Sequence, residues 1–403
     1  MNEKKIKNRW LVLFCICCNT FCFGGVYAWS AFSGGLAEYM GWDYGRVTVA
    51  YSIMLMTIAV MGLAGGALLQ RFGARRLMMA AGVMWGLGWL STGFAGSIPA
   101  LYASIGLLAG CASGFGYNPG VVTAVKWFPD RKGFASGMAV GVCGVASLIV
   151  APFANFLLTR FDVMTAFRIV GGCFLFISLA TSWYIDGPPE GWLPEGFQAP
   201  KTAESTGKTW REMLGDPRFY LLWATLLCAS VAGLMLIGHA SMIGREVAGI
   251  TAGQAALLVG IMAAANFCGR LVLGSLSDCL GRHRIVISVM ITGALDMVFL
   301  SRAESFAGFV AAIVIAGVCF GGTLATFSAI SSDTFGSKYN GINYSIIFTG
   351  YGIASIVGPN AATWIKNSSG SYSKAFLFAA VCSILAAGLC MAAGRMNRKM
   401  EVK

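Results

Sequence analysis

Long apolar runs recur along the whole chain, and short polar segments separate them. Each run spans about 20 residues, the length that an α-helix needs to cross the hydrocarbon core of a bilayer. The pattern therefore predicts an all-α membrane protein with twelve transmembrane helices. Their expected ranges are 10–34, 44–70, 76–96, 99–125, 133–158, 165–185, 218–240, 252–276, 284–301, 306–330, 341–364 and 373–394.

The longest interruption of this pattern is the polar segment 187–216. It contains four prolines and several charged residues, which is typical of a linker. The segment divides the chain into two predicted six-helix bundles, residues 1–186 and residues 217–403. We expect the linker itself to be cytoplasmic.

Two motifs recur in the two halves at one offset. The first motif is GALLQRFGARR at 66–76 and GSLSDCLGRHR at 274–284, and the second is KWFPDRKG at 126–133 and DTFGSKYNG at 333–341. Gly66 and Gly274 lie 208 positions apart, as do Gly133 and Gly341. This internal repeat predicts two pseudo-symmetric bundles around a central cavity, with a substrate site near the bilayer midplane.

Composition supports the membrane assignment, and the charge distribution orients the chain. Only 11% of the residues are charged, whereas soluble proteins carry about 25%. In the predicted topology, 21 of the 29 Lys and Arg residues lie on the side of the two termini, seven lie on the other side and one lies within a span. The positive-inside rule makes the first side cytoplasmic, and we expect the protein to lie in a cell inner membrane. The net charge of +12 is thus a topology signal, and we expect no nucleic-acid partner.

The residue within a span is Arg270, in the otherwise uncharged stretch 255–277. A charge at the middle of a helix costs about 2.5–3.5 kcal/mol on insertion scales, so such an arginine usually faces a cavity, a partner or a ligand. Its planar guanidinium group suits a carboxylate or a phosphate. We predict that Arg270 binds a small organic anion and that Asn266, one helical turn earlier, assists it.

Four aromatic residues are further candidates for the substrate site: Tyr27, Tyr117, Phe348 and Tyr351. Tyrosine hydroxyls can hydrogen-bond a carboxylate, and the rings can restrict the size of the acid; ordinary helix packing is the alternative for each. Asp296 in the ninth span and His239 at the outer end of the seventh are candidates for proton-linked roles.

The repeated turns contain candidates for a conformational latch. These are Arg71, Arg75, Asp278 and Arg282. Such side chains can reach carbonyl and carboxylate groups at neighbouring helix ends and thereby stabilise one state of the transporter. The alternative is that the basic turns only set the topology.

At these motifs the chain resembles the major facilitator superfamily. Segment 274–284 looks like the signature loop of that superfamily, whereas the first copy carries Gln70 in place of the aspartate. A closer resemblance, to the oxalate/formate antiporter family, covers essentially the whole chain. It rests on the segments NRW at 8–10, GVYAWS at 25–30, KWFPDRKG at 126–133 and FGSKYNGINY at 335–344.

The resemblance implies a major facilitator fold and carboxylate transport by alternating access. Asn266 and Arg270 look like the substrate-binding arginine and its neighbour in the related monocarboxylate transporters. Oxalate antiporters are expected to carry a lysine in the eleventh helix, where this chain has Tyr351. With one cation instead of two, a dianion would enter incompletely neutralised. We therefore expect a monocarboxylate of the lactate, pyruvate or formate class; oxalate:formate antiport and an anion-binding membrane sensor without transport are the alternatives.

No nucleotide-binding motif, zinc-ligand spacing or nucleophile constellation occurs in the sequence. We therefore expect neither an enzyme nor a cofactor or metal site. The expected partners are a small carboxylate, protons and the lipid bilayer, and we expect a monomer. Proton symport and anion antiport both stay open as coupling modes.

Overall fold

The regular structure of this protein is helical. The computed structural model describes residues 6–189, 191–194, 197, 207–248, 252–303 and 305–401, and no strand occurs among them. In chain order the elements are α1 (Arg9–Phe23), η1 (Gly24–Ala28), α2 (Trp29–Met40), α3 (Tyr44–Thr92), α4 (Ile98–Leu101), η2 (Tyr102–Ala109), α5 (Gly110–Trp127), α6 (Lys132–Leu158), α7 (Val163–Ser182), α8 (Trp210–Leu214), α9 (Pro217–Ala248), α10 (Ala252–Leu280), α11 (Arg282–Leu300), α12 (Phe306–Phe335), α13 (Asn340–Ser369) and α14 (Ser373–Glu401).

These helices confirm the expectation of an all-α membrane protein. Ten stretches in the described part of the chain are long and apolar enough to cross a membrane. One of them, Val49–Thr92, has 44 residues and is about twice as long as one crossing requires. It overlaps most of the predicted second and third spans, 44–70 and 76–96. The more polar α13 contains the predicted eleventh span, so all twelve predicted spans correspond to helices.

Two of the predicted spans are not regular α-helices. The first is interrupted by η1, a 3₁₀ segment that begins with Gly24 and Gly25. Gly25 faces the rings of Phe174 and Trp85, which leave no room for a side chain. The fourth begins in α4, passes through the π-helical segment η2 and continues as α5, which contains Pro119. Such irregular turns in a membrane helix often mark functional sites.

The contacts divide the chain into two compact units. Unit 1 comprises Met1–Asp130, Val142–Glu204 and Asn340–Ser345, and unit 2 comprises Arg131–Gly141, Ser205–Tyr339 and Ile346–Lys403. Helix α6 therefore begins in unit 2 and continues in unit 1, and α13 begins in unit 1 and continues in unit 2. The boundaries expected at 1–186, 187–216 and 217–403 stay a prediction.

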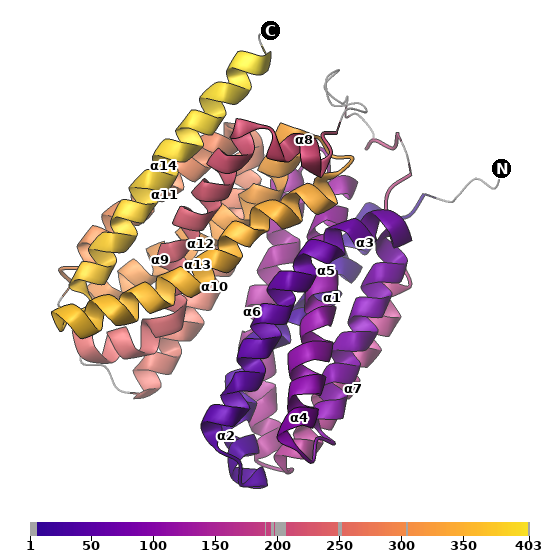
Figure 1. Cartoon of the computed structure of the whole chain (residues 1–403), viewed down its shortest axis with the longest axis vertical. Helices are drawn as coiled ribbons and strands as arrows, with labels where there is room; N and C mark the ends of the chain where they lie inside the picture. The colour runs from indigo at the N-terminus through magenta and orange to yellow at the C-terminus, as the bar shows by residue number, and fades with distance from the viewer. Residues whose placement is uncertain are drawn as a thin grey trace. The chain divides into compact units, whose positions relative to one another are not determined.

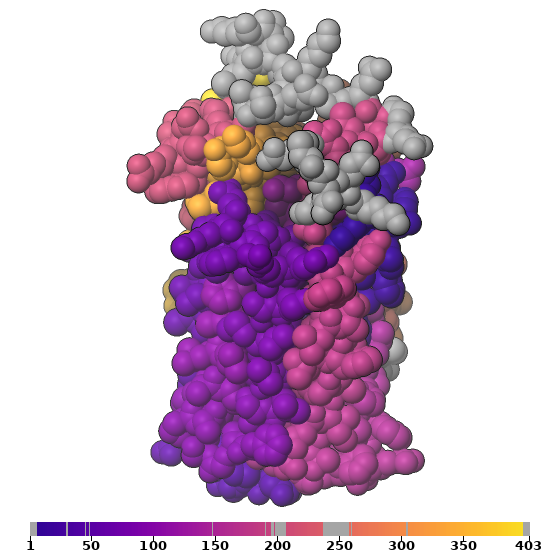
Figure 2. Space-filling view, turned by 90° about the vertical axis from the view of Figure 1, so that its right-hand side faces the viewer, coloured from indigo at the N-terminus to yellow at the C-terminus, as the bar shows by residue number. Residues whose placement is uncertain are grey.

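Unit 1 is built around α3, which packs against both α5 and α7. In Figure 1 its helices α1, α5 and α7 run side by side, and Figure 2 shows the violet α3 region lying along the magenta α7 region. The core contains a cluster of buried aromatic rings. Its members are Phe23, Phe32, Trp85, Trp89, Phe167 and Phe174, with neighbouring ring centroids 4.6–6.1 Å apart.

In unit 2, α10 packs along α12, and α14 packs along α11 and α9 (Figure 1). Its buried core is mainly aliphatic, with the rings of Phe309, Tyr372 and Phe376 among the alanine, leucine and methionine side chains. Small side chains allow these helices to approach closely, which is how helices associate in a bilayer.

The repeat found in the sequence recurs in the backbone. Gly73, the kink within α3, has φ 76° and ψ 166°. Gly281, between α10 and α11, has φ 94° and ψ 133°. The two residues lie 208 positions apart, and both adopt positive φ values that other residues rarely tolerate. The repeated turns thus share a backbone conformation as well as a sequence.

Candidate functional site

Arg270 is buried within unit 2, with 5% of its surface exposed. It lies in the interior of α10, and its Nη1 donates a hydrogen bond to the carbonyl oxygen of Val140 in α6. Its buried Nε has no hydrogen-bond partner, and no carboxylate of the described residues forms an ion pair with the guanidinium group. The charge of Arg270 is therefore not neutralised by the described part of the protein.

Glycines of two neighbouring helices fix the position of α10 around Arg270. A methyl group added to Gly137 in α6 would overlap the carbonyl oxygen of Arg270. A methyl group added to Gly141 would contact the ring of Phe267 at 2.8 Å. On the other side, Gly321 in α12 allows the carbonyl oxygen of Asn266 to approach equally closely. The backbone that carries Asn266 and Arg270 is thus held between α6 and α12.

Asn266 lies one turn before Arg270 and is also buried, with 6% of its surface exposed. No hydrogen bond of its side-chain amide to any described residue is present. Residues i and i+4 share a helix face, so the amide and the guanidinium group emerge on the same side of α10. The pair offers hydrogen-bond donors of two kinds to one ligand.

Three aromatic rings stack within unit 2. The ring of Tyr351 lies 4.7 Å from that of Phe348 on the same helix, α13, and 6.4 Å from that of Phe320 on α12. The interplanar angles of these two pairs are 18° and 22°. Two of the predicted site residues, Phe348 and Tyr351, therefore lie together. Phe320 is a further member that the sequence analysis did not identify.

The other two predicted tyrosines belong to unit 1 and lie in its irregular helices. Tyr27 is in η1 and is 43% exposed. Tyr117 is in α5, two residues before Pro119. Asn118, which lies between Tyr117 and Pro119, is 4% exposed, and its Oδ1 has no hydrogen-bond partner in the described structure. Asn118 is thus an additional buried polar residue beside Tyr117.

Two residues have predicted proton-linked roles, Asp296 and His239, and the structure describes the side chain of Asp296 alone. Asp296 lies in α11 and is 5% exposed, and neither of its carboxylate oxygens has a hydrogen-bond partner among the described residues. No ion pair joins it to Arg270. The backbone of His239 belongs to α9, but its side chain lies outside the described part of the structure.

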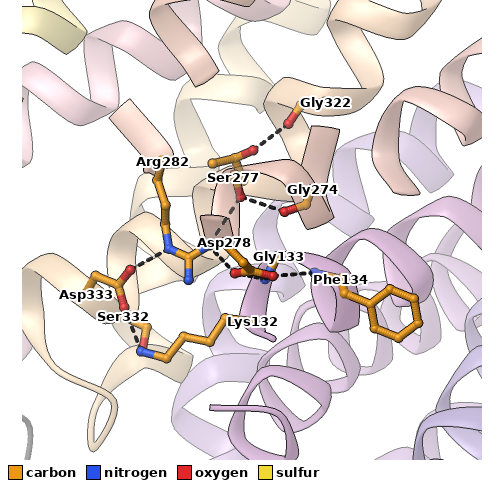
Figure 3. Close-up of polar contacts among 11 residues, drawn as sticks. Lys132, Gly133, Phe134, Gly274, Ser277, Asp278, Arg282, Gly322, Ser332 and Asp333 are labelled. Atoms are coloured by element: carbon orange, nitrogen blue, oxygen red, sulfur yellow. Dashed lines mark hydrogen bonds and ion pairs between the residues drawn. The ribbon is translucent and has the colours of Figure 1, made fainter. Parts of the chain in front are cut away.

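A second polar cluster surrounds Asp278 at the end of α10 (Figure 3). The Asp278 carboxylate accepts hydrogen bonds from the backbone N–H groups of Gly133, at 2.9 Å, and Phe134, at 3.2 Å. These N–H groups belong to the first turn of α6, where a helix has unsatisfied donors and a partial positive charge. The carboxylate also forms an ion pair of 2.7 Å with Nη1 of Arg282.

Arg282 extends this cluster to α12 and back to α6. Its Nε forms an ion pair with Oδ2 of Asp333, and Oδ1 of Asp333 lies 2.6 Å from Nζ of Lys132 (Figure 3). Lys132 directly precedes Gly133, so the interactions form a closed ring through the ends of four helices, α6, α10, α11 and α12. We refer to Lys132, Asp278, Arg282 and Asp333 as the charge ring.

The first repeat lacks an equivalent ring. The residues 208 positions before Asp278, Arg282 and Asp333, and after Lys132, are Gln70, Ala74, Val125 and Asn340, none of which is charged. Arg71 is exposed and lies over the ring of Phe72, and Arg75 lies over the ring of Trp183 at 5.4 Å. Neither arginine forms an ion pair with a described carboxylate. The backbone contact itself is retained, since Gly66 approaches the carbonyl group of Gly341.

The sequence pattern predicts a latch role for Asp278 and Arg282 but none for Lys132 or Asp333. Both residues lie in the repeated segments 126–133 and 333–341, so the repeat contained a signal for them. The carbonyl oxygen of Val140 could not be identified in this way, because a backbone atom has no sequence signature. No group of three or more His, Cys, Asp or Glu side chains that could hold a metal ion occurs within the searched, described residues.

Comparisons with known proteins agree with this architecture. The sequence profile of the Major Facilitator Superfamily matches residues 10–359 and 246–401. The chain is 32% identical over 354 residues to the uncharacterized MFS-type transporter YhjX of Escherichia coli (strain K12), a match that covers 87% of this chain and 86% of that one. It is 29% identical over 398 residues to the oxalate:formate antiporter of Oxalobacter formigenes, covering 98% and 94%.

More distant relatives extend the same picture. Monocarboxylate transporter 12 of Rattus norvegicus is 24% identical over 391 residues, which cover 89% of this chain and 80% of that one. Among solved structures, the transporter FucP in the outward conformation superimposes with a TM-score of 0.76, at 11% identity, over 94% of this chain and 98% of its own. That likeness concerns the fold alone. The chain therefore belongs to the Major Facilitator Superfamily, as an integral membrane transporter related to the oxalate:formate antiporter and the monocarboxylate transporters.

Proposed function

We propose that this transporter carries small monocarboxylates of the lactate, pyruvate or formate class by alternating access, with the carboxylate bound to Arg270. The observation that carries the proposal is the state of that side chain. Arg270 is buried, donates to a single carbonyl oxygen and has an unpartnered Nε. A buried cation without a counter-ion is costly, so an anionic ligand that completes its hydrogen bonds is strongly favoured.

The charge of the site favours a monoanion. The position at which oxalate antiporters are expected to carry a second cation is Tyr351, whose ring stacks with Phe320 and Phe348. One guanidinium group balances one carboxylate, and aromatic rings restrict the volume available to the rest of the acid. We also propose Asn266, Tyr27 and Tyr117 as substrate-binding residues.

Replacing Arg270 tests the proposal. We expect Arg270→Ala and Arg270→Lys each to reduce uptake of labelled lactate, pyruvate or formate into proteoliposomes by at least tenfold, since lysine keeps the charge but loses the planar fork. The matched control is Arg302→Ala, which removes an exposed arginine of the same unit. Uptake by Arg270→Ala at the wild-type rate would refute the assignment. Saturable binding to the wild-type protein without any flux would support the sensor instead.

Exchange of oxalate for formate is the second candidate function. It is favoured by the match to the oxalate:formate antiporter over 98% of this chain. We expect oxalate to compete poorly with a labelled monocarboxylate in the wild type and at least tenfold better in Tyr351→Lys, which adds the second cation. Tyr351→Phe controls for the loss of the hydroxyl group. Oxalate competition in the wild type that equals that of formate would favour the exchanger.

The charge ring is our proposed conformational latch. Asp278 and Arg282 join the first turn of α6 to α10 and α11 through these hydrogen bonds and this ion pair. Arg71 and Arg75 are proposed for the equivalent turn of the first repeat. Their interactions there do not include a described carboxylate.

The proposal also concerns proton coupling and the location of the protein in the membrane. Asp296 is a buried carboxyl group and His239 a titratable side chain of α9, so both are proposed as proton-linked residues. If Asp296 serves proton symport, Asp296→Asn will abolish the stimulation of uptake by an inward proton gradient while leaving exchange intact. We propose that the protein is a monomer in a cell inner membrane. We place both termini and the linker on the cytoplasmic side, because 21 basic residues lie on that side of the predicted topology.

A further inference from the structure

Unit 1 contains a cavity of about 540 Å³ that belongs to neither the Arg270 region nor the charge ring. It lies where four segments of the unit meet: the residues before α1, the kink of α3, the end of α5 and the residues after α7. Its volume is within the range of about 300–1,000 Å³ that is common for small-molecule sites. Binding of the proposed monocarboxylate at Arg270 does not involve this cavity.

Three cations and one carboxylate line the cavity: Lys7, Arg75, Lys126 and Asp186. Lys7 is engaged, since its Nζ lies 3.5 Å from Oδ2 of Asp186 and donates to the carbonyl oxygen of Tyr184 at 2.9 Å. The other two cations have no carboxylate partner among the described residues. The described part of the lining thus has an excess of two positive charges.

Arg75 and Lys126 are both half-buried. The guanidinium group of Arg75 stacks over Trp183, and its buried Nε donates to no described residue. The ammonium group of Lys126, in the last turn of α5, has neither a hydrogen bond nor an ion pair with a described residue. Two partly desolvated cations that face one cavity repel each other unless an anion lies between them.

We propose that this cavity binds a phosphate group, held by Arg75 and Lys126. A phosphate offers several acceptor oxygens and one or two negative charges, which match the excess charge of the lining. The planar fork of arginine and the compact ammonium group of lysine are both common phosphate ligands. Basic pockets between membrane helices bind lipid head groups in this manner.

The phosphate can come from an anionic lipid or from the aqueous phase. Large apolar side chains beside the cavity are exposed, with Trp183 at 68% and Ile6 at 64%. Exposed tryptophans are enriched at the depth of lipid head groups. We therefore expect phosphatidylglycerol to occupy the cavity in preference to free phosphate.

The experiment compares two charge-removing variants with a matched control. Lys126→Gln and Arg75→Gln remove cations that line the cavity, whereas Arg76→Gln removes an exposed cation from the adjacent position that does not line it. The purified full-length protein is titrated with dioleoyl-phosphatidylglycerol and with dioleoyl-phosphatidylcholine, and bound lipid is counted by native mass spectrometry. Inorganic phosphate is titrated separately, and stabilisation against thermal unfolding is recorded.

We expect the wild type and Arg76→Gln to retain phosphatidylglycerol selectively, and Lys126→Gln and Arg75→Gln to bind it at least tenfold more weakly. Lys126→Arg, which keeps the charge, should bind like the wild type and shows that the protein still folds. Stabilisation by inorganic phosphate that disappears in the same two variants would support the site with a soluble ligand. Equal binding of both probes by all variants, or no binding to the wild type, would overturn the proposal.

Discussion

At the residue scale, Asp216 shows how a single carboxylate organises the start of α9. It receives hydrogen bonds from Lys208 Nζ and Arg218 Nη2, both at 2.6 Å. Burial by itself would raise the pKa of Asp216, but these hydrogen bonds outweigh it and hold the pKa well below the usual range. Arg218 in turn donates to Asn397 near the end of α14, so the carboxylate supports a contact between distant parts of the chain.

This arrangement predicts a pH-dependent contribution to stability. A depressed pKa in the folded state stabilises the protein at pH values above the unfolded-state pKa, near 3.9, and the contribution is lost as the pH falls through the folded-state value. We expect Asp216→Asn to lower the melting temperature at pH 7, and the difference from the wild type to shrink as the pH falls below about 4. Thermal unfolding of the purified protein measures both.

The control for this prediction is Glu38→Gln, which neutralises an exposed carboxylate of α2. It should leave the melting temperature at pH 7 nearly unchanged. A loss of stability in Asp216→Asn that stayed constant down to the lowest pH would show that the charge of Asp216 does not stabilise the fold.

At the scale of helices, glycine positions determine how closely α10 approaches its neighbours. Gly321 in α12 leaves room for the carbonyl oxygen of Asn266. A methyl group at Gly321 would also lie close to the backbone nitrogen of Arg270. A methyl group at this position must push α10 and α12 apart. Overpacking of this kind costs about 1–3 kcal/mol and moves the backbone that carries the proposed site.

We therefore expect Gly321→Ala to reduce substrate uptake by at least tenfold. The matched substitution is Gly388→Ala in α14, since an added methyl group there meets no atom within 4 Å. Uptake rates, normalised to the amount of folded protein in the membrane, distinguish the two. Equal rates for both variants would mean that the close approach of α10 and α12 is not needed for transport.

At the scale of the whole molecule, the two repeats share a backbone but differ in charge. Asp278 binds the first turn of α6 in the second repeat, whereas Gln70 occupies the equivalent position in the first. Hydrogen bonds to charged groups contribute about 1.5–3 kcal/mol each, so the second repeat has the stronger contact. The repeated turns are thus alike in backbone conformation but different in charge.

Exchanging the residues at these equivalent positions tests the asymmetry. We expect Asp278→Asn to destabilise the protein by about 1–3 kcal/mol, because the amide is a weaker acceptor for Arg282 and for the N–H groups of α6. Gln70→Asp should stabilise it by about 0.3–1 kcal/mol, because position 70 lies one turn after Gly66, which closely approaches Gly341 at the start of α13. Gln70→Asn is the neutral control. If Asp278→Asn and Gln70→Asn had the same melting temperature, this account would be contradicted.

Much of the fold could be predicted from the sequence, because apolar runs of fixed length have few structural solutions in a bilayer. The turn at Gly73 was visible as the boundary between two spans, and its equivalence to Gly281 followed from the repeat. The 3₁₀ and π-helical segments η1 and η2 were not predicted, since hydropathy is the same for every type of helix.

The neighbours of the candidate residues were harder to predict. Arg270 stood out because its charge is anomalous within an apolar run. Its hydrogen bond to Val140 depends on tertiary packing that the pattern of side chains does not encode. Asp333 and Lys132 meet only after four helix ends have come together, so their pairing required the structure.

The division of α6 between the two units has a consequence for the covalent chain. Residues Arg131–Gly141 belong to the first half of the sequence but pack within unit 2, and Asn340–Ser345 belong to the second half but pack within unit 1. Each half of the polypeptide thus completes the core of the other. The linker is then not the sole tether between the halves, and two separately translated fragments joined by no peptide bond retain complementary surfaces through which to reassemble.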